Sequence, residues 1–480
     1  MSVINTNVAS LNAQRNLSTS ASALSTSLQR LSSGLRINSA KDDAAGLAIS
    51  ERFTSQIRGL DQAKRNANDG VSMLQTAEGS LQSTGNILQR VRELAVQSSN
   101  ATNSAGDRKA IQAEVGQLLS EADRIAQTSE FNGLKLLDGS FGTATFQVGA
   151  NAGQTIQATT ANFRTNNYGN NEAATAAPTT LATTGTAYTA GSFALQGLAT
   201  TNIAVTTSDT AQSLASTING ATATTGVTAQ AKTEEAITLA ANGVYSLAVT
   251  SDNSTAANVT FTVGAATNAS GLASAVSAFN DVSSKTGVTA KLNDTNDGLV
   301  LTNAAGNNIT LANNSAAATV TAAAINSAGT VGTTASVVTG ATSTSMGYVS
   351  MNSDKGFSVG SSGSTAIAAS TAATLNTVSG IDVSTAKGSS QALKVLDSAL
   401  ANVNSQRASF GALQSRFETA VSNLQSTSEN LSASRSRIQD TDFASETAKL
   451  TRGQILQQAG TAMLAQANSL PNGVLSLLRG

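Results

Sequence analysis

Apolar residues recur every seven positions near the start of the chain. Leu17, Leu24 and Leu31 keep this spacing, and Leu28 and Leu35 supply the intermediate position. Two apolar stripes at heptad spacing are typical of a helix that packs against another helix. The pattern therefore predicts an N-terminal helix with a narrow apolar seam.

The heptad pattern then stops and restarts. Ser33-Gly34 and residues 38–46 contain Gly and Asn, which favour turns and weaken a helix. Seven-residue spacing resumes in Leu60, Ala67, Leu74, Leu81, Leu88 and Ala95. We expect one long helix from about Ala45 to Ser99.

A third helix and a hairpin region follow. Ser104 and Asp107 resemble a capping box after a turn over 98–106. The apolar face of the next helix is expected to consist of Ile111, Val115, Leu118, Ala122 and Ile125. This helix should fold back on the long one. Turn dipeptides predict hairpins between Phe131 and Ile156.

The C-terminal part keeps one heptad phase for the longest stretch. Its seam residues are Leu396, Val403, Phe410, Phe417, Leu424, Leu431 and Ile438. At about 1.5 Å per residue this seam is roughly 65 Å long, so it needs an equally long partner. The partner in the same chain is the 45–99 helix. We expect an antiparallel or bundled coiled coil with the middle of the chain looped out.

The middle of the chain differs from its ends. Residues 171–380 hold only 13 charged side chains, and the segment is rich in Ala, Thr, Gly and Asn with short apolar runs. This composition predicts β-rich domains. Residues 214–229 and 272–290 share similar motifs about 60 positions apart, which indicates an internal repeat. The predicted fold class is α+β: a long helical coiled-coil bundle from both termini, with β-rich outer domains inserted in the middle.

Composition narrows the possible functions. The chain has no Cys and no His, which excludes disulfides, thiolate metal sites, imidazole bases and histidine triads. The net charge of -1 gives no long-range attraction to nucleic acid or to an anionic membrane. No run of about 18 apolar residues is present to span a bilayer. Residues 1–17 lack the basic and apolar regions of a cleaved secretion signal, so we expect export without one.

The end segments carry unusually little charge. Arg15, Arg30 and Arg36 are the only charged side chains in residues 1–36, and most positions off the seam are Ser, Thr, Asn, Ala or Gln. A solvated helix normally carries more charge. We expect both ends to become ordered when they are flanked by neighbouring copies. A subunit that joins head-to-tail in this way grows a helical filament.

Three motifs carry a resemblance to a known family. They are Val3-Ile4-Asn5-Thr6-Asn7, the stretch 31–47 reading LSSGLRINSAKDDAAGL, and Val474-Leu475-Ser476-Leu477-Leu478-Arg479. The sequence resembles bacterial flagellin over about 1–170 and 390–480. The resemblance implies a non-enzymatic structural subunit that polymerises into the filament used for swimming, without cofactors or metals. It also implies type III export to the cell exterior.

The resemblance further implies a division of the chain into domains. Residues 1–44 and 440–480 would form an inner-core helical domain. Residues 45–175 and 391–439 would form an outer-core helical domain with a β-hairpin region. Residues 176–390 would form variable, surface-exposed domains. The implied partners are copies of the chain, the export chaperone, and the filament cap and hook-filament junction proteins, with no nucleic acid and no membrane.

Two sets of site residues are implied as well. The stretch 89–97 is similar to the patch bound by vertebrate flagellin-sensing Toll-like receptors, with expected contacts Gln89, Arg90, Leu94, Glu114 and Gln117. The alternative is an ordinary solvated helix face that packs on a neighbouring subunit. Self-assembly is expected to use Leu17, Leu24, Leu28, Leu31, Leu35, Leu470, Leu475, Leu477, Leu478 and Arg479. The last residues also resemble the segment contacted by the export chaperone and by cytosolic immune sensors.

Other functions have weaker support in the sequence. A hook-associated junction protein or a secreted adhesin would share the terminal coiled coil. Ser384-Thr385-Ala386-Lys387, Ser251-Asp252-Asn253 and Lys285-Thr286-Gly287 match patterns of penicillin-binding enzymes, but their order along the chain is wrong for that family. Adjacent Asp42 and Asp43 do not share a helix face, so a turn and helix-start role is favoured over a glycosidase pair. The chain is therefore predicted not to be an enzyme.

Overall fold

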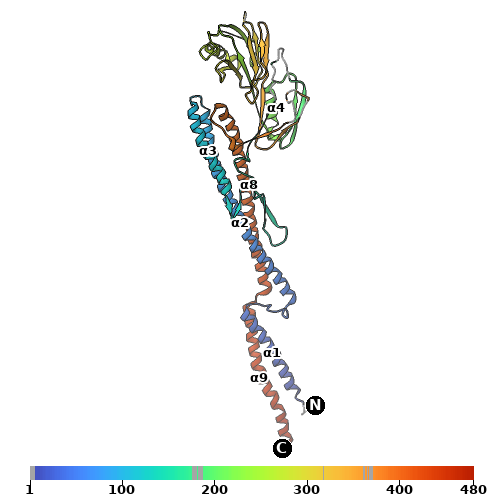
Figure 1. Ribbon diagram of the computed structural model, residues 1–480. Coiled ribbons are helices and arrows are strands. Elements are labelled where there is room, and N and C mark those ends of the chain that lie inside the picture. The colour runs from blue at the N-terminus through green and yellow to red at the C-terminus, as the bar shows by residue number, and fades with distance from the viewer. Residues whose placement is uncertain are drawn as a thin grey trace. The chain divides into compact units, whose positions relative to one another are not determined.

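The computed structural model describes residues 6–175, 181, 188–316, 318–360, 363–364, 366 and 371–479. Helices come from both ends of the chain, and strands come mainly from its middle (Figure 1). The chain divides into two compact units. One comprises Met1–Thr76, Thr143–Thr159 and Ser409–Gly480, and the other comprises Ala77–Gly142 and Thr160–Ala408. This arrangement is the α+β class predicted from the sequence.

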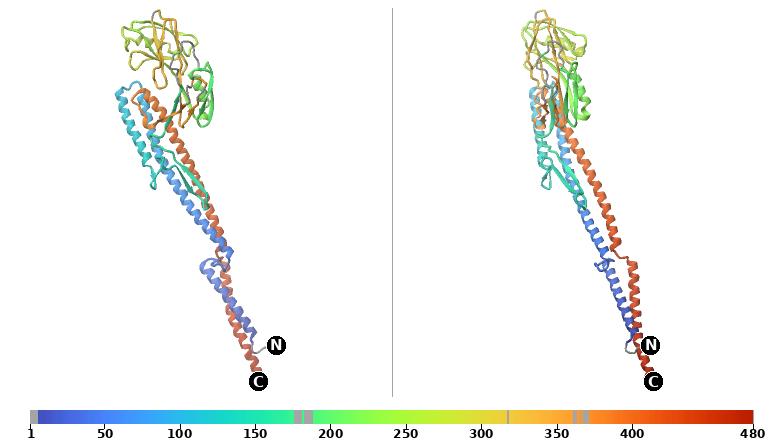
Figure 2. Two further views of the ribbon diagram at one scale, coloured as in Figure 1. Left: turned by 45° about the vertical axis from the view of Figure 1, so that its right-hand side comes forward. Right: turned by 90° about the vertical axis from the view of Figure 1, so that its right-hand side faces the viewer.

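The first unit is built mainly from helices at the two chain ends. Helix α1 (Val8–Ser33) packs antiparallel on α9 (Phe443–Arg479), and the two run side by side in both views of Figure 2. The unit also contains the first part of α2 (Ala44–Ser99) and the last part of α8 (Ala386–Gln439). A hairpin of β3 (Thr143–Gln147) and β4 (Thr155–Thr159) completes it.

The breaks between these helices are hydrogen-bonded to each other. Gly34 ends α1 in the left-handed region, with φ +71°. The Arg36 amide donates to the Gln439 carbonyl at 2.6 Å, and the Thr441 amide donates to the Gly34 carbonyl at 2.9 Å. Asp42 accepts hydrogen bonds from the turn at residues 38–39. The predicted break and the predicted turn role of this aspartate are confirmed.

Helices α2 and α8 are antiparallel within each unit. In the first unit Lys64 contacts Gln425 at 3.2 Å. In the second unit Arg92 contacts Asp397 at 2.7 Å. The predicted α2 seam residues are all buried, and the α8 seam is buried from Leu396 to Leu424. The heptad prediction is confirmed for α2 and for α8 as far as Leu424, whereas the last two predicted α8 positions, Leu431 and Ile438, are only half-buried.

The packing of this coiled coil includes aromatic rings. Phe417 of α8 is fully buried, and its ring meets that of Phe146 in β3 edge-on, with centroids 5.5 Å apart. A Cβ atom placed on Gly70 of α2 would lie 2.9 Å from the Phe417 ring. The absence of a side chain at position 70 therefore lets α2 approach the ring closely.

Helix α3 (Ala105–Thr128) begins at the predicted capping box. The Ser104 amide donates to the Asp107 carboxylate at 2.9 Å, and the Asp107 amide donates to the Ser104 hydroxyl oxygen at 3.2 Å. The buried face partly differs from the predicted one. Its buried members are Ile111, Val115, Leu119, Ala122 and Ala126, whereas Leu118 and Ile125 are only half-buried. Spacings of three and four residues fit both sets equally well, so the contacts of α3 with its neighbours decide which residues are buried.

Strands dominate the rest of the second unit. A short hairpin joins β1 (Glu130–Phe131) to β2 (Leu134–Lys135). Among the described residues, three larger antiparallel sheets follow. The first has the order β10 (Ala257–Thr262), β9 (Val244–Thr250), β13 (Ile309–Asn313), β16 (Thr342–Ser345). Its apolar face shares a core with Ile237, Phe279 and Leu301.

The second sheet is the largest. Its order is β11 (Val288–Leu292), β12 (Leu299–Asn303), β8 (Thr228–Thr238), β17 (Tyr348–Ser353), β5 (Gly169–Ala174), β20 (Thr374–Thr377). Strand β8 also pairs with β14 (Val320–Ala324), which pairs with β15 (Ala335–Val337). The third sheet has the order β19 (Thr371–Ala372), β18 (Ser358–Val359), β6 (Gly191–Gln196), β7 (Thr200–Val205). A 3-10 turn, η1 (Val378–Gly380), precedes α8.

One local arrangement occurs twice in this unit. Helices α4 (Ala211–Gly220) and α5 (Thr222–Thr225) lead into β8, and helices α6 (Ala273–Asp281) and α7 (Ser283–Thr286) lead into β11. Asn219 exchanges two hydrogen bonds with the backbone of Ala229, at 2.7 and 2.9 Å. Asn280 does the same with Ala290, at 2.8 and 3.1 Å. The similar sequence motifs therefore make the same contacts.

Candidate self-assembly surface

Helices α1 and α9 meet along a seam of leucine and glycine. A Cβ atom on Gly460 would lie 3.0 Å from Leu17 Cδ1, and one on Gly453 would lie 3.3 Å from Leu24 Cδ1. Each leucine therefore packs onto a position where α9 has no side chain. This packing brings the two backbones close, but it buries little area on either helix.

Polar contacts fix the register of this helix pair. The Ser27 hydroxyl donates to Glu446 at 2.6 Å, and Lys449 contacts the same carboxylate at 3.2 Å. These two contacts hold the pKa of Glu446 below its usual value. Near the other end, the Asn7 side chain donates to the Ala467 carbonyl at 2.8 Å. Such specific contacts define one alignment of α1 on α9.

The helix pair leaves much of its apolar surface exposed. Only Ser10 and Ser27 of α1 are buried. Seven large apolar side chains of the pair are at least 50% exposed: Val8, Leu11, Leu28, Phe443, Ile455, Leu456 and Met463. By contrast, α2 buries a continuous seam. These side chains point in several directions around the two helices, which is typical of helices that pack against further molecules on more than one side.

The predicted assembly residues fall into three groups. Leu17, Leu24 and Leu31 are half-buried in α1, and Leu35 is half-buried at a backbone bridge to Asp440. Leu28 is 51% exposed, so it faces away from the helix pair rather than into its seam. The backbone of α9 is described to Arg479, but five of the predicted side chains lie outside the described residues: Leu470, Leu475, Leu477, Leu478 and Arg479.

The sequence interpretation missed six of the exposed apolar residues. They are Val8, Leu11, Phe443, Ile455, Leu456 and Met463, and none of them belongs to a predicted heptad seam. A sequence signal for these residues does exist: they are apolar residues that lie outside the seam of a helix with few charged side chains.

A second predicted site lies where α2 faces α3. Arg90 forms ion pairs with Glu93 at 3.0 Å and Glu114 at 3.2 Å, which raise the pKa of the guanidinium. Gln89 and Gln117 are exposed on the same two helices. Leu94 is only 2% exposed, so its side chain belongs to the helix core. The receptor contact expected of Leu94 stays a prediction.

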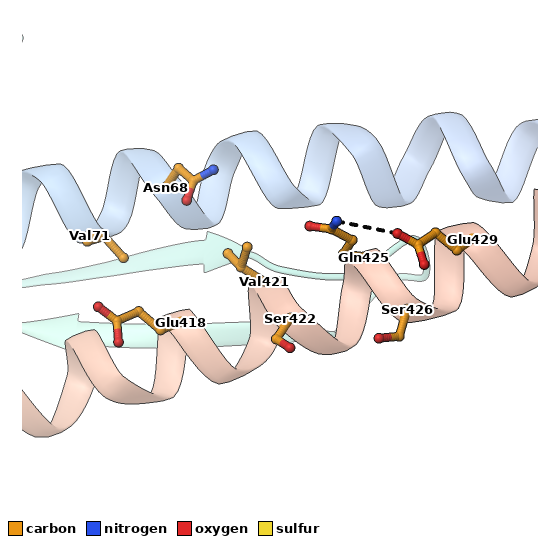
Figure 3. A pocket seen from close by; sticks show the side chains of 8 residues that line it. All are labelled: Asn68, Val71, Glu418, Val421, Ser422, Gln425, Ser426 and Glu429. Carbon is orange, nitrogen blue, oxygen red and sulfur yellow. Dashed lines mark hydrogen bonds between the residues drawn. The ribbon is translucent and has the colours of Figure 1, made fainter.

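A shallow groove lies along α2 and α8 in the first unit (Figure 3). Asn68 and Val71 of α2 line it, together with Val421 and Gln425 of α8. Gln425 donates to Glu429, one turn further along α8, at 3.4 Å. No group of three or more acidic, His or Cys side chains in the described parts of the chain is placed to hold a metal ion. The groove thus offers a polar surface without a metal centre.

The patterns resembling penicillin-binding enzymes have structural roles. Asp252 accepts hydrogen bonds from Asn303 and Asn307 at 2.7 and 2.8 Å, and its amide donates to the Thr286 carbonyl. Lys387 donates to the Ala328 carbonyl at 2.6 Å, near the start of α8. These contacts hold turns and a helix start.

None of the described helices has a stretch long and apolar enough to cross a membrane.

Comparisons with known proteins match both ends and the full length of the chain. Residues 4–142 match the bacterial flagellin N-terminal helical region, and residues 393–478 match the C-terminal helical region. B-type flagellin of Pseudomonas aeruginosa is 44% identical, with 99% of each chain covered. Flagellin B of Vibrio cholerae is 37% identical over 99% of each chain. The chain belongs to the bacterial flagellin family. FliC of Burkholderia pseudomallei is a solved structure with 24% identity, covering 72% of this chain and 99% of that one, with a TM-score of 0.31.

Membership of the flagellin family decides the main functional question. The chain is a structural subunit that self-assembles into the flagellar filament outside the cell, where it serves motility, and it is not an enzyme. The full-length relatives named above are flagellins, so the filament role is supported over that of a junction protein or adhesin.

Proposed function

We propose that the α1–α9 pair is the surface through which this flagellin joins its neighbours in the filament. The proposal is supported by the seven apolar side chains that are at least 50% exposed on these two helices. Fully burying one such side chain contributes roughly 1.5–3 kcal/mol. Covering the exposed half of all seven would therefore contribute on the order of 5–10 kcal/mol per subunit, as an upper bound.

The sparse charge of α1 supports the same role. Arg15 and Arg30 are the only charged residues in Val8–Ser33. A polymer interface must exclude water, and each buried unpaired charge would oppose that. Helix α1 can therefore be enclosed by neighbouring subunits at little electrostatic cost.

The domain division follows from this assignment. Residues 1–44 and 440–480 would form the inner core of the filament, and 45–175 with 391–439 the outer core. The β-rich residues 176–390 would face solvent. The charged side chains concentrated outside 171–380 support specific contacts between neighbouring outer cores.

Recognition by a host receptor is a second proposed role, carried by the exposed side chains of Gln89, Arg90, Glu114 and Gln117. The Arg90 guanidinium is already held by two carboxylates, which fixes its position before a partner arrives. A preordered charged group loses less conformational entropy on binding.

The residues from Leu470 onward are proposed to bind the export chaperone. Export would take place through the flagellar type III apparatus.

Deletion of residues 1–40 tests the assembly proposal. The truncated chain should stay folded and soluble, with the helical signal of α2, α3 and α8 intact, and should not elongate filament fragments used as seeds. Seeding removes nucleation as a cause of failure. If the truncated chain still elongates the seeds, the role assigned to α1 is wrong.

A further inference from the structure

A set of buried oxygen atoms in the second unit has no hydrogen-bond partner among the described residues. It comprises both carboxylate oxygens of Glu235 and the hydroxyl oxygens of Thr233, Ser343 and Ser345. All four residues are at most 2% exposed. Buried polar atoms are almost always hydrogen-bonded in folded proteins, because an unpaired one loses its contact with water without compensation. Such a set requires an explanation.

The fold brings these oxygen atoms together. Thr233 and Glu235 are two residues apart on β8 and share one face of that strand, and Ser343 and Ser345 share one face of β16. Strand β16 lies against β8. A Cβ atom on Gly347, just after β16, would lie 2.4 Å from Thr233 Oγ1. The Ser343 hydroxyl is close enough to affect the Glu235 carboxyl without forming a regular hydrogen bond.

None of the basic side chains in the described residues pairs with Glu235. Its neighbours across the sheet are Leu301 on β12 and Ala324 on β14, both buried and apolar. Lys232 projects from the opposite face of β8 and pairs with Glu234 at 2.7 Å. Strands β12, β13, β14 and β16 contain no ionisable residue. The carboxylate is therefore surrounded only by apolar groups and hydroxyls.

In its charged form Glu235 would need a partner that the described residues do not supply. Burial raises the pKa of Glu235 well above its usual value, and the nearby Ser343 hydroxyl only partly offsets this. An isolated carboxylate is very unfavourable in such surroundings. The five oxygen atoms do not bond one another, although hydroxyl groups rotate freely.

We propose that Thr233, Glu235, Ser343 and Ser345 form a buried site for a dehydrated alkali cation, Na⁺ or K⁺. Carboxylate and hydroxyl oxygens are hard donors that suit such ions. One carboxylate neutralises one positive charge, whereas a divalent ion would leave an uncompensated charge in the core. The bound cation would join β8 to β16 and so tie together the two sheets that share this core.

Calorimetric unfolding of the full-length monomer at pH 8 tests the proposal. The transition of the β-rich region should rise in NaCl or KCl relative to choline chloride at equal ionic strength. A cation concentration ten times the Kd should raise it by about 3–6 °C. Hydrogen exchange of β8 and β16 peptides should slow under the same conditions. Glu235→Gln should abolish the response, and Asp294→Asn, at an exposed acidic position, should retain it.

Two measurements on the unaltered chain keep the test independent of how the variants fold. Binding should broaden the ²³Na resonance, and added K⁺ should reverse the broadening. In a crystal soaked with Rb⁺, an anomalous peak should lie beside the Glu235 carboxylate. Equal stability in Na⁺, K⁺ and choline, with no broadening and no peak, would overturn the proposal. The carboxyl would then be protonated and hydrated, and stability would fall with rising pH whatever the cation.

Discussion

The substitution Ile455→Ser separates assembly from folding. Ile455 lies on α9 and is 60% exposed in the structure, so it makes few contacts within the subunit. Changes at such positions usually alter the stability of the folded chain by less than about 0.5 kcal/mol. The monomer should therefore keep its helical content and its thermal midpoint.

Assembly should respond far more strongly than folding. If neighbours bury the remaining 60% of this side chain, the loss is roughly 1–2 kcal/mol per subunit. That free energy corresponds to a factor of about 5–30 in an equilibrium constant. The critical concentration for elongation of filament seeds, measured by sedimentation, should rise by this factor. Thr461→Ser, at an exposed polar position of α9, serves as the matched control and should leave it unchanged.

Two results would refute this reasoning. An unchanged critical concentration for a correctly folded Ile455→Ser chain would show that neighbours do not cover this face of α9. A large loss of monomer stability would show that the side chain contributes to the fold of the subunit itself.

Three further predictions concern the Phe417 ring, the α3 capping box and the Glu446 carboxyl group. Phe417→Ala removes a fully buried ring that packs on Phe146 and should cost roughly 3–5 kcal/mol, seen as a lower thermal midpoint of the monomer. A loss below about 1 kcal/mol would contradict this. Ser104→Ala removes the α3 capping box and should cost about 1 kcal/mol, with faster hydrogen exchange confined to the first turn of α3. Because the pKa of Glu446 is lowered in the folded state, its contribution is fully present above the usual carboxyl pKa and is lost as pH falls through the folded value. Circular dichroism should show less acid sensitivity for Glu446→Gln than for the unaltered chain, and equal sensitivity would count against the Ser27–Glu446 contact.

The helical part of the fold was predictable because its determinants are local or periodic. The α8 seam from Leu396 to Leu424 is buried along its whole length. Its seven-residue spacing alone predicts which residues are buried, and its length predicts that the partner is α2. The Ser104 capping box depends on residues three positions apart. The one-residue shift from Leu118 to Leu119 in α3 could not be read from heptad spacing, because it depends on where α3 meets the other helices.

The rest depends on contacts between distant segments. Nothing near Glu235 in the sequence distinguishes it from Glu234, yet one is buried without a partner and the other pairs with Lys232. The pairing of β8 with β12 and β14, which are far along the chain, places Glu235 in this core. Leu94 was placed on the receptor-binding surface by resemblance, but its side chain faces the helix core. The exposure of apolar residues on α1 and α9 could not be predicted either, because it depends on how little of each helix the contact between the two helices covers.

Hydrogen exchange of the isolated monomer and of the filament tests the central claim most directly. The claim is that α1 and α9 gain their stability from neighbouring subunits rather than from each other. Amides of residues 8–33 should exchange rapidly in the monomer and slowly in the filament, while those around Leu81 of α2 should be protected in both. Equal protection of α1 and the centre of α2 in the isolated monomer would contradict the account.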